Sequence, residues 1–141
     1  MTTFDTDIEH GRYVRFYVEV SAPTSRRNPA RYRALVDTGA TTSAATRDVI
    51  ERLGITATGI ESVSTPIGQV QTDTFDLDIA LPVNTPDAAS AWGDGYLYGT
   101  PHAVIAIGLG RRISDCDIVL GMDVLSRLCF TMCDGRFEIH S

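Results

Sequence analysis

The chain of 141 residues contains no lysine, three cysteines and one tryptophan, and it has no apolar run long enough to span a membrane. All twelve of its basic residues other than histidine are arginine, and eighteen acidic residues bring the formal net charge to −6. This acidic balance argues against a nucleic-acid binder that works by neutralising phosphates. We interpret the missing lysine as codon bias rather than as a functional feature.

Cysteine is too scarce and too irregularly placed to build a disulfide framework or a zinc site. Cys116 stands alone, and Cys129 and Cys133 lie at an even spacing that would place them on one face of a strand. There is no C-x-x-C pair and no histidine at zinc-ligand spacing. We therefore expect reduced, partly buried thiols in a reducing compartment. The N-terminus lacks the basic and apolar regions of a signal peptide, which favours a cytoplasmic location.

Length and composition predict one domain over residues 1–141. A hydrophobic content of 43% and a charged content of 21% are ordinary for a soluble globular chain that buries its own core. Apolar residues alternate with polar ones over residues 13–20 and again over residues 75–81, which is the period of a strand buried on one face. We therefore expect an all-β fold with one or two short helices.

Further elements are predicted from local signals. Short helices are expected over residues 46–53, with Thr46 as the N-cap and Gly54 as the stop, and over residues 122–128. The Asp134-Gly135 pair predicts a hairpin turn. The other strands are expected over residues 31–36, 59–64, 70–81, 103–107 (short and buried), 118–121, 129–132 and 136–139.

The run Ala34-Leu35-Val36-Asp37-Thr38-Gly39-Ala40-Thr41 carries the main chemical signal. It places a carboxylate, Asp37, on a tight turn at the end of a buried strand. Thr38 offers a hydroxyl that can hold the turn, and Gly39 allows a backbone or a substrate to approach closely. The chain contains this motif once, with no second Asp-Thr-Gly or Asp-Ser-Gly.

A second motif follows about eighty residues later. The run Ile118-Val119-Leu120-Gly121-Met122-Asp123-Val124-Leu125 joins an apolar strand to a glycine and a short helix. Asp123 is interpreted as a helix-start residue rather than a catalyst. Together the two motifs resemble the signatures of the retropepsin-like aspartic protease family, whose fold is a closed β-barrel with one lobe per chain.

The resemblance implies the following roles. Asp37 would pair with its copy in a homodimer, with Thr38 and Gly39 supporting the active-site turn. Ala40, Ile67 and Gly68 would contact a peptide substrate, the last two from a flap hairpin over residues 60–75. The C-terminal hairpin over residues 129–139 resembles the dimer-forming end of the family, and residues 84–101 are an insertion. The resemblance implies an aspartic endopeptidase without metal or cofactor, acting on peptides and not on nucleic acid or membranes.

Two alternatives stay open at this point. The chain can be a retropepsin-fold module that dimerises and binds peptides without cleaving them. The run Val36-Asp37-Thr38-Gly39-Ala40-Thr41-Thr42-Ser43 also looks like the phosphate loop of actin-like ATPases. That fold needs two large domains and further nucleotide motifs, which a chain of this length does not accommodate.

Overall fold

The computed structural model describes residues 2–23, 29–82 and 102–140. These ranges are mainly β, with two short helices, as predicted. The elements are β1 (Thr2–Asp7), β2 (Arg15–Ser21), β3 (Ala30–Val36), β4 (Ala44–Thr46), α1 (Arg47–Leu53), β5 (Gly59–Thr65), β6 (Gly68–Ala80), β7 (His102–Leu109), β8 (Ile118–Leu120), α2 (Met122–Leu125), β9 (Cys129–Cys133) and β10 (Arg136–His140).

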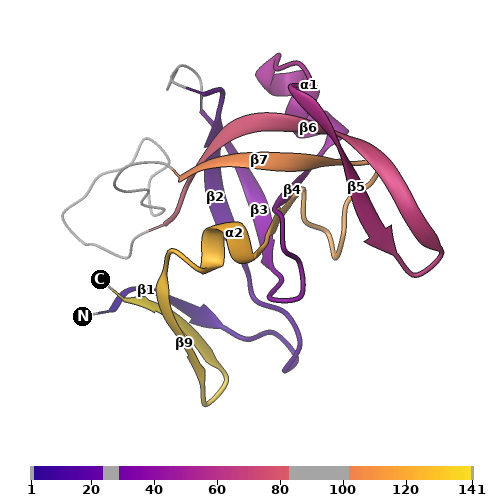
Figure 1. Cartoon of the computed structure of the whole chain (residues 1–141). Coiled ribbons are helices and arrows are strands. Elements are labelled where there is room, and N and C mark those ends of the chain that lie inside the picture. The colour runs from indigo at the N-terminus through magenta and orange to yellow at the C-terminus, as the bar shows by residue number, and fades with distance from the viewer. Residues whose placement is uncertain (1, 24–28, 83–101, 141) are drawn as a thin grey trace.

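The larger sheet is a seven-stranded sheet that closes on itself. Its order is β2-β3-β8-β4-β7-β6-β5, and an additional pairing of β2 with β6 joins the two sides. Strands β3 and β8 run parallel, so Val36 pairs with Leu120 at their ends. This pairing brings the two sequence motifs side by side although they are far apart in the chain (Figure 1).

The smaller sheet has three antiparallel strands in the order β1-β10-β9. It places the N- and C-terminal ends of the chain next to each other, on the other side of α2 from the β5–β6 hairpin (Figure 1). The turn between β9 and β10 is formed by Asp134 and Gly135, both with positive φ, as the sequence predicts. Strand β1 was not predicted, because its Thr-Thr-Phe-Asp-Thr-Asp sequence carries little apolar alternation.

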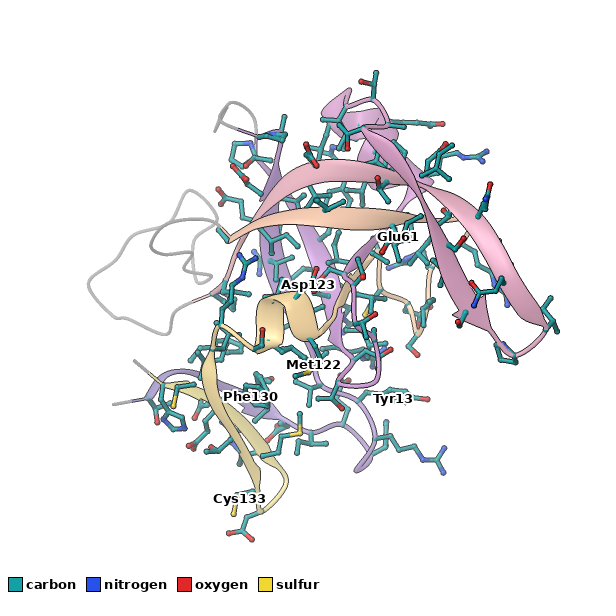
Figure 2. All side chains as sticks on the ribbon, viewed as in Figure 1. Tyr13, Glu61, Met122, Asp123, Phe130 and Cys133 are labelled. Atoms are coloured by element: carbon teal, nitrogen blue, oxygen red, sulfur yellow. The ribbon has the colours of Figure 1, made fainter. Side chains whose placement is uncertain are left out.

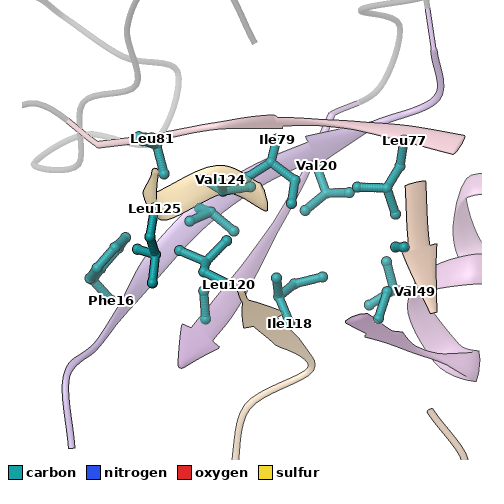
Figure 3. Packing of buried hydrophobic residues seen from close by; sticks show 14 of the residues in the cluster. Phe16, Val20, Val49, Leu77, Ile79, Leu81, Ile118, Leu120, Val124 and Leu125 are labelled. Carbon is teal, nitrogen blue, oxygen red and sulfur yellow. The ribbon is translucent and has the colours of Figure 1, made fainter. Parts of the chain in front are cut away.

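The core fills the interior of the closed sheet. Val14, Phe16, Val18 and Val20 are all buried, which confirms the alternation predicted for this strand. Leu77, Ile79 and Leu81 of the second alternating run are buried against them and against both helices (Figure 3).

Three local expectations need correction. Thr46 is the N-cap residue of α1 but makes no side-chain cap bond, because its hydroxyl donates to Asp117 Oδ1 at 2.9 Å instead. Helix α2 is one turn long and ends before residue 126 rather than at residue 128. Strand β7 is longer than predicted and is not buried throughout: Ala106 is buried, whereas Ile105 is 56% exposed.

The cysteines are free, as expected, but their environments differ from the prediction of partly buried thiols. Cys116 is fully buried, whereas Cys129 and Cys133 are exposed on β9. The even spacing therefore does place the last two on one face of a strand, and that face is open to solvent.

Some predictions fall on residues outside the described ranges. The insertion expected at residues 84–101 lies there. In the parts of the chain that are described, neither helix has the length and apolar character needed to cross a bilayer.

Gly121, between β8 and α2, lies against the backbone of the loop that follows Asp37. A Cβ atom at this position would lie 2.8 Å from the Thr42 carbonyl carbon and 2.9 Å from the Ala40 carbonyl oxygen. Real Cβ atoms do not approach backbone this closely, so only glycine fits without a shift of the loop. The second motif needs its glycine for space at this contact.

We expect Gly121→Ala to destabilise the fold by about 1–3 kcal/mol, because the added methyl group forces the Asp37 loop away. Urea unfolding of the purified variant measures this. Gly110→Ala is the matched control, since its Cβ would meet no atom within 4 Å. Equal unfolding free energies for the two variants would show that the contact is unimportant.

We also expect the three thiols to differ in reactivity. Burial raises the pKa of the Cys116 thiol, and alkylation requires an accessible thiolate. Under native conditions at mildly alkaline pH, iodoacetamide should label Cys129 and Cys133 first and Cys116 only after denaturant is added. Peptide mass spectrometry resolves the order, and labelling of native Cys116 as fast as the other two would contradict the described burial.

Candidate active site

Asp37 follows directly on β3, at the start of a turn whose backbone holds its side chain. The Asp37 N–H donates to the Leu120 carbonyl at 3.0 Å, which fixes the start of the turn against β8. The Gly39 N–H donates to Asp37 Oδ1 at 3.0 Å. A Cβ on Gly39 would lie 3.3 Å from the same oxygen, so glycine leaves room for the carboxylate. One carboxylate oxygen is thus oriented by the turn itself.

Thr38 sits at the exposed tip of this turn. Within the described part of the chain, its hydroxyl makes no hydrogen bond. The described contacts therefore do not include the bond by which the Thr38 hydroxyl was expected to hold the turn. Its predicted role across a subunit boundary stays a prediction.

A buried polar contact links the Asp37 loop to the second motif. Ser43 is fully buried, and its hydroxyl donates to Asp123 Oδ1 at 2.7 Å while its N–H donates to Asp123 Oδ2 at 3.0 Å. The Ser43 hydroxyl oxygen also accepts from the Gly121 N–H at 3.0 Å. Both carboxylate oxygens and the hydroxyl have hydrogen-bond partners. This contact therefore fixes the end of the loop without leaving any of these polar atoms unpaired.

Asp123 has the structural role that the sequence favoured, together with one that it did not reveal. It lies in the first turn of α2 and its carboxylate accepts from the Val124 N–H at 3.0 Å. The Met122 N–H next to it donates to the Ala40 carbonyl at 2.8 Å. Figure 2 shows Met122 and Asp123 at the centre of the molecule, on the short helix. The bond from Asp123 to Ser43 joins residues 80 apart, so no local pattern indicates it.

Asp37 faces an open cavity of ≈ 540 Å³ between its own loop and the β5–β6 hairpin. The walls come from three elements: the Asp37 loop, β5 and β7. The lining residues are Asp37, Gly39, Ala40, Thr41, Thr42, Glu61, Ser62, Val63, Ser64 and Ile107.

The structure brings some predicted site residues together and leaves others apart. Ala40 and Gly39 line the cavity with Asp37. Ile67 and Gly68 do not line it: Ile67 is 94% exposed at the hairpin tip, and Gly68 has a φ of +123° as the turn requires. A role for these two in covering a substrate stays a prediction.

Sequence reasoning missed the β5 wall of the cavity. Glu61, Ser62, Val63 and Ser64 are consecutive, and the register of β5 with β6, in which Glu61 pairs with Thr72, sets their position. The prediction of a flap identified the correct hairpin, but it placed the substrate contacts at the tip of the hairpin rather than on its first strand, β5. Figure 2 shows Glu61 on this strand.

The arrangement offers acid–base chemistry from a positioned carboxylate. Asp37 can accept a proton from a water molecule held in the cavity. Within the described ranges, no three side chains of His, Cys, Asp and Glu cluster as a metal site would require.

Removing the Ser43 hydroxyl tests the link between the two motifs. Ser43→Ala leaves the Gly121 N–H without its partner and removes one of the two hydrogen bonds to Asp123 Oδ1, so we expect a loss of about 1–3 kcal/mol of unfolding free energy. Ser126→Ala, an exposed serine just after α2, should change stability by less than about 0.5 kcal/mol. Chemical denaturation compares them, and a Ser43 variant as stable as the wild type would refute the link.

Known proteins resemble this chain in part of its sequence and in its fold. A family model described as "Aspartyl protease" matches residues 24–88, which include the Asp37 turn and the β5–β6 hairpin. No curated protein sequence matches the chain.

Among solved structures, a retropepsin-like aspartic protease from Rickettsia conorii is similar at a TM-score of 0.58 and 17% identity, over 96% of this chain and 88% of that one. The retroviral protease-like domain of Ddi1 from Leishmania major aligns at a TM-score of 0.41 and 16% identity, over 89% of this chain and 93% of that one. The Rickettsia structure shows that the fold is retropepsin-like. Together with the sequence match over residues 24–88, this fold makes the chain similar to retropepsin-like aspartyl proteases.

Proposed function

We propose that the protein is a homodimeric aspartic endopeptidase that hydrolyses peptide bonds with two Asp37 carboxylates, one from each subunit. The observation that carries the proposal is the Asp37 turn: its carboxylate is oriented by the Gly39 N–H and faces an open cavity. Since the chain has one such turn, a second copy is the source of the second acid.

The paired carboxylates would divide the work of the reaction. Two carboxyl groups about 3 Å apart in a shielded site cannot both ionise, so they share one proton. The aspartic-protease dyad is the established example of this behaviour. The ionised carboxylate takes a proton from the attacking water, and the protonated one supplies a proton to the leaving amine.

The surrounding residues would position the substrate and the turn. The Thr38 hydroxyl lies at the exposed tip and makes no hydrogen bond to the described residues, so it is available to a partner subunit. A peptide would lie extended in the cavity beside β5, where strand-like hydrogen bonds can hold it. Ile67 and Gly68 at the tip of the hairpin would close over it and exclude water. The mechanism uses no metal or cofactor.

The direct test is hydrolysis of a diverse peptide pool by wild-type protein and by Asp37→Asn. The amide keeps the shape of the side chain but cannot take a proton from water, so we expect cleavage to fall by about 10²-fold or more. Asp48→Asn, an exposed acid on α1, should keep wild-type activity. Mass spectrometry of the pool, from acid to neutral pH, gives the rates.

Two results would overturn the proposal. Cleavage that survives Asp37→Asn would show a different catalytic group or a contaminating protease. A folded wild-type protein that binds peptides but cleaves none at any pH would instead be the non-proteolytic binding module.

A further inference from the structure

We propose that a disulfide can lock two copies of the chain together at β9, when the hairpin that the resemblance gives as the dimer-forming end pairs antiparallel with its copy about Thr131. This register sets Cys129 of one chain opposite Cys133 of the partner subunit, so that a small-molecule disulfide can lock the dimer covalently. The inference rests on the homodimer proposed above and adds the register of β9 and its redox sensitivity.

The first observation is an unprotected edge. Among the described strands β9 pairs only with β10, so one side of its backbone has no strand partner. Cys129, Thr131, Met132 and Cys133 are exposed, and Phe130 is half-buried. The strand has no charged residue and no proline, the usual features that prevent edge-to-edge pairing.

The opposite edge of the same sheet shows the contrast. Strand β1 carries Asp5 and Asp7, and both pair with Arg136 of β10. These charges protect β1 from pairing with another strand. Of the two edges of the three-stranded sheet, β9 is therefore the one suited to a partner strand. Figure 2 shows Cys133 at the free end of this hairpin, with Phe130 turned toward the body of the molecule.

The register follows from the turn. Asp134 and Gly135 form a two-residue turn, so Cys133 and Arg136 are the hydrogen-bonded pair beside it. Hydrogen-bonded and non-hydrogen-bonded pairs alternate along β9 and β10. The backbone N–H and C=O groups of Phe130 and Met132 therefore point away from β10, to the free edge. A two-fold pairing must join these outward-pointing groups with each other.

Pairing about Thr131 is the register that uses the whole strand. It sets Phe130 against Met132 of the partner subunit in hydrogen-bonded pairs, with Thr131 against its own copy. The sequence Cys-Phe-Thr-Met-Cys is symmetric about this centre in residue size and polarity. Centring on Phe130 or Met132 shortens the paired segment and leaves cysteine opposite threonine.

The same register places the thiols at bridging distance. Cys129 and Cys133 of the partner subunit form a non-hydrogen-bonded pair, with Cα atoms about 4.5 Å apart. This lies within the range of roughly 4.4–6.8 Å found for disulfides. Within one chain, the two cysteines are separated by four residues of extended strand, about 13 Å, and cannot bridge. A disulfide between them therefore joins two chains.

The oxidation is a thiol–disulfide exchange with a small-molecule disulfide such as oxidised glutathione. The Cys129 thiolate attacks one sulfur of the small disulfide, forms a mixed disulfide and releases one small thiol. The thiolate of Cys133 of the partner subunit then attacks the Cys129 sulfur and releases the second. Each bridge thus oxidises two protein thiols and reduces one small disulfide to two thiols. Cys116 is buried and takes no part.

The test uses oxidised glutathione, non-reducing electrophoresis and peptide mass spectrometry on the full chain. Wild-type protein should form a covalent dimer that dithiothreitol reverses. Cys129→Ser alone and Cys133→Ser alone should form none, because each remaining cysteine faces a serine. An equimolar mixture of the two variants should form a covalent dimer again, with one Cys129–Cys133 bridge. Urea unfolding confirms that each variant is folded.

Other outcomes overturn the inference. A single variant that cross-links by itself to the wild-type extent, or a mapped bridge between identical cysteines, excludes this register. Wild-type protein that stays uncross-linked while sedimentation shows a dimer excludes β9 as its interface. The readout is mass rather than activity, so a cross-linked dimer without peptide hydrolysis would count against the endopeptidase alone, and hydrolysis without cross-linking against β9 alone.

Discussion

The position of Asp37 depends on the contact between its loop and the segment from Leu120 to Asp123. The backbone of Gly121 leaves no room for a side chain against residues 40–42. Hydrogen bonds from Asp37 to Leu120, from Met122 to Ala40 and from Ser43 to Asp123 hold the loop from its first residue to its last. The Asp37 turn is therefore held firmly against the sheet by groups that lie behind it rather than in the cavity.

This rigidity limits the chemistry available to one chain. A carboxylate held by its own turn can face substrate without a neighbouring side chain to orient it, and its open side is free for another molecule. Such preorganisation costs nothing during the reaction. It also leaves a single chain with half of an acid–base pair. In this account, association of two chains is part of the catalytic mechanism, and features that control association would control activity.

Much of the fold and part of the site were predictable from the sequence. Alternation identified β2 and β6, the Asp-Gly pair identified the β9–β10 turn, and the two motifs identified the turn of Asp37 and its neighbour β8. The alternation and the Asp-Gly pair are local signals, and each of the two motifs can be recognised in its own short stretch of sequence. Strands β1 and β4 were missed because each is defined by long-range pairing, β1 with β10 and β4 with β7 and β8. The Ser43–Asp123 bond and the β5 wall of the cavity were missed for the same reason.

The central claim is that catalysis needs two copies of Asp37, and the most direct test compares assembly with activity over a concentration series. Sedimentation equilibrium gives the fraction of chains in dimers, and initial rates on one cleaved peptide give the activity per chain at the same concentrations. The account predicts that activity per chain falls on dilution in proportion to the dimer fraction. Constant activity per chain, down to concentrations where sedimentation finds single chains, would contradict it.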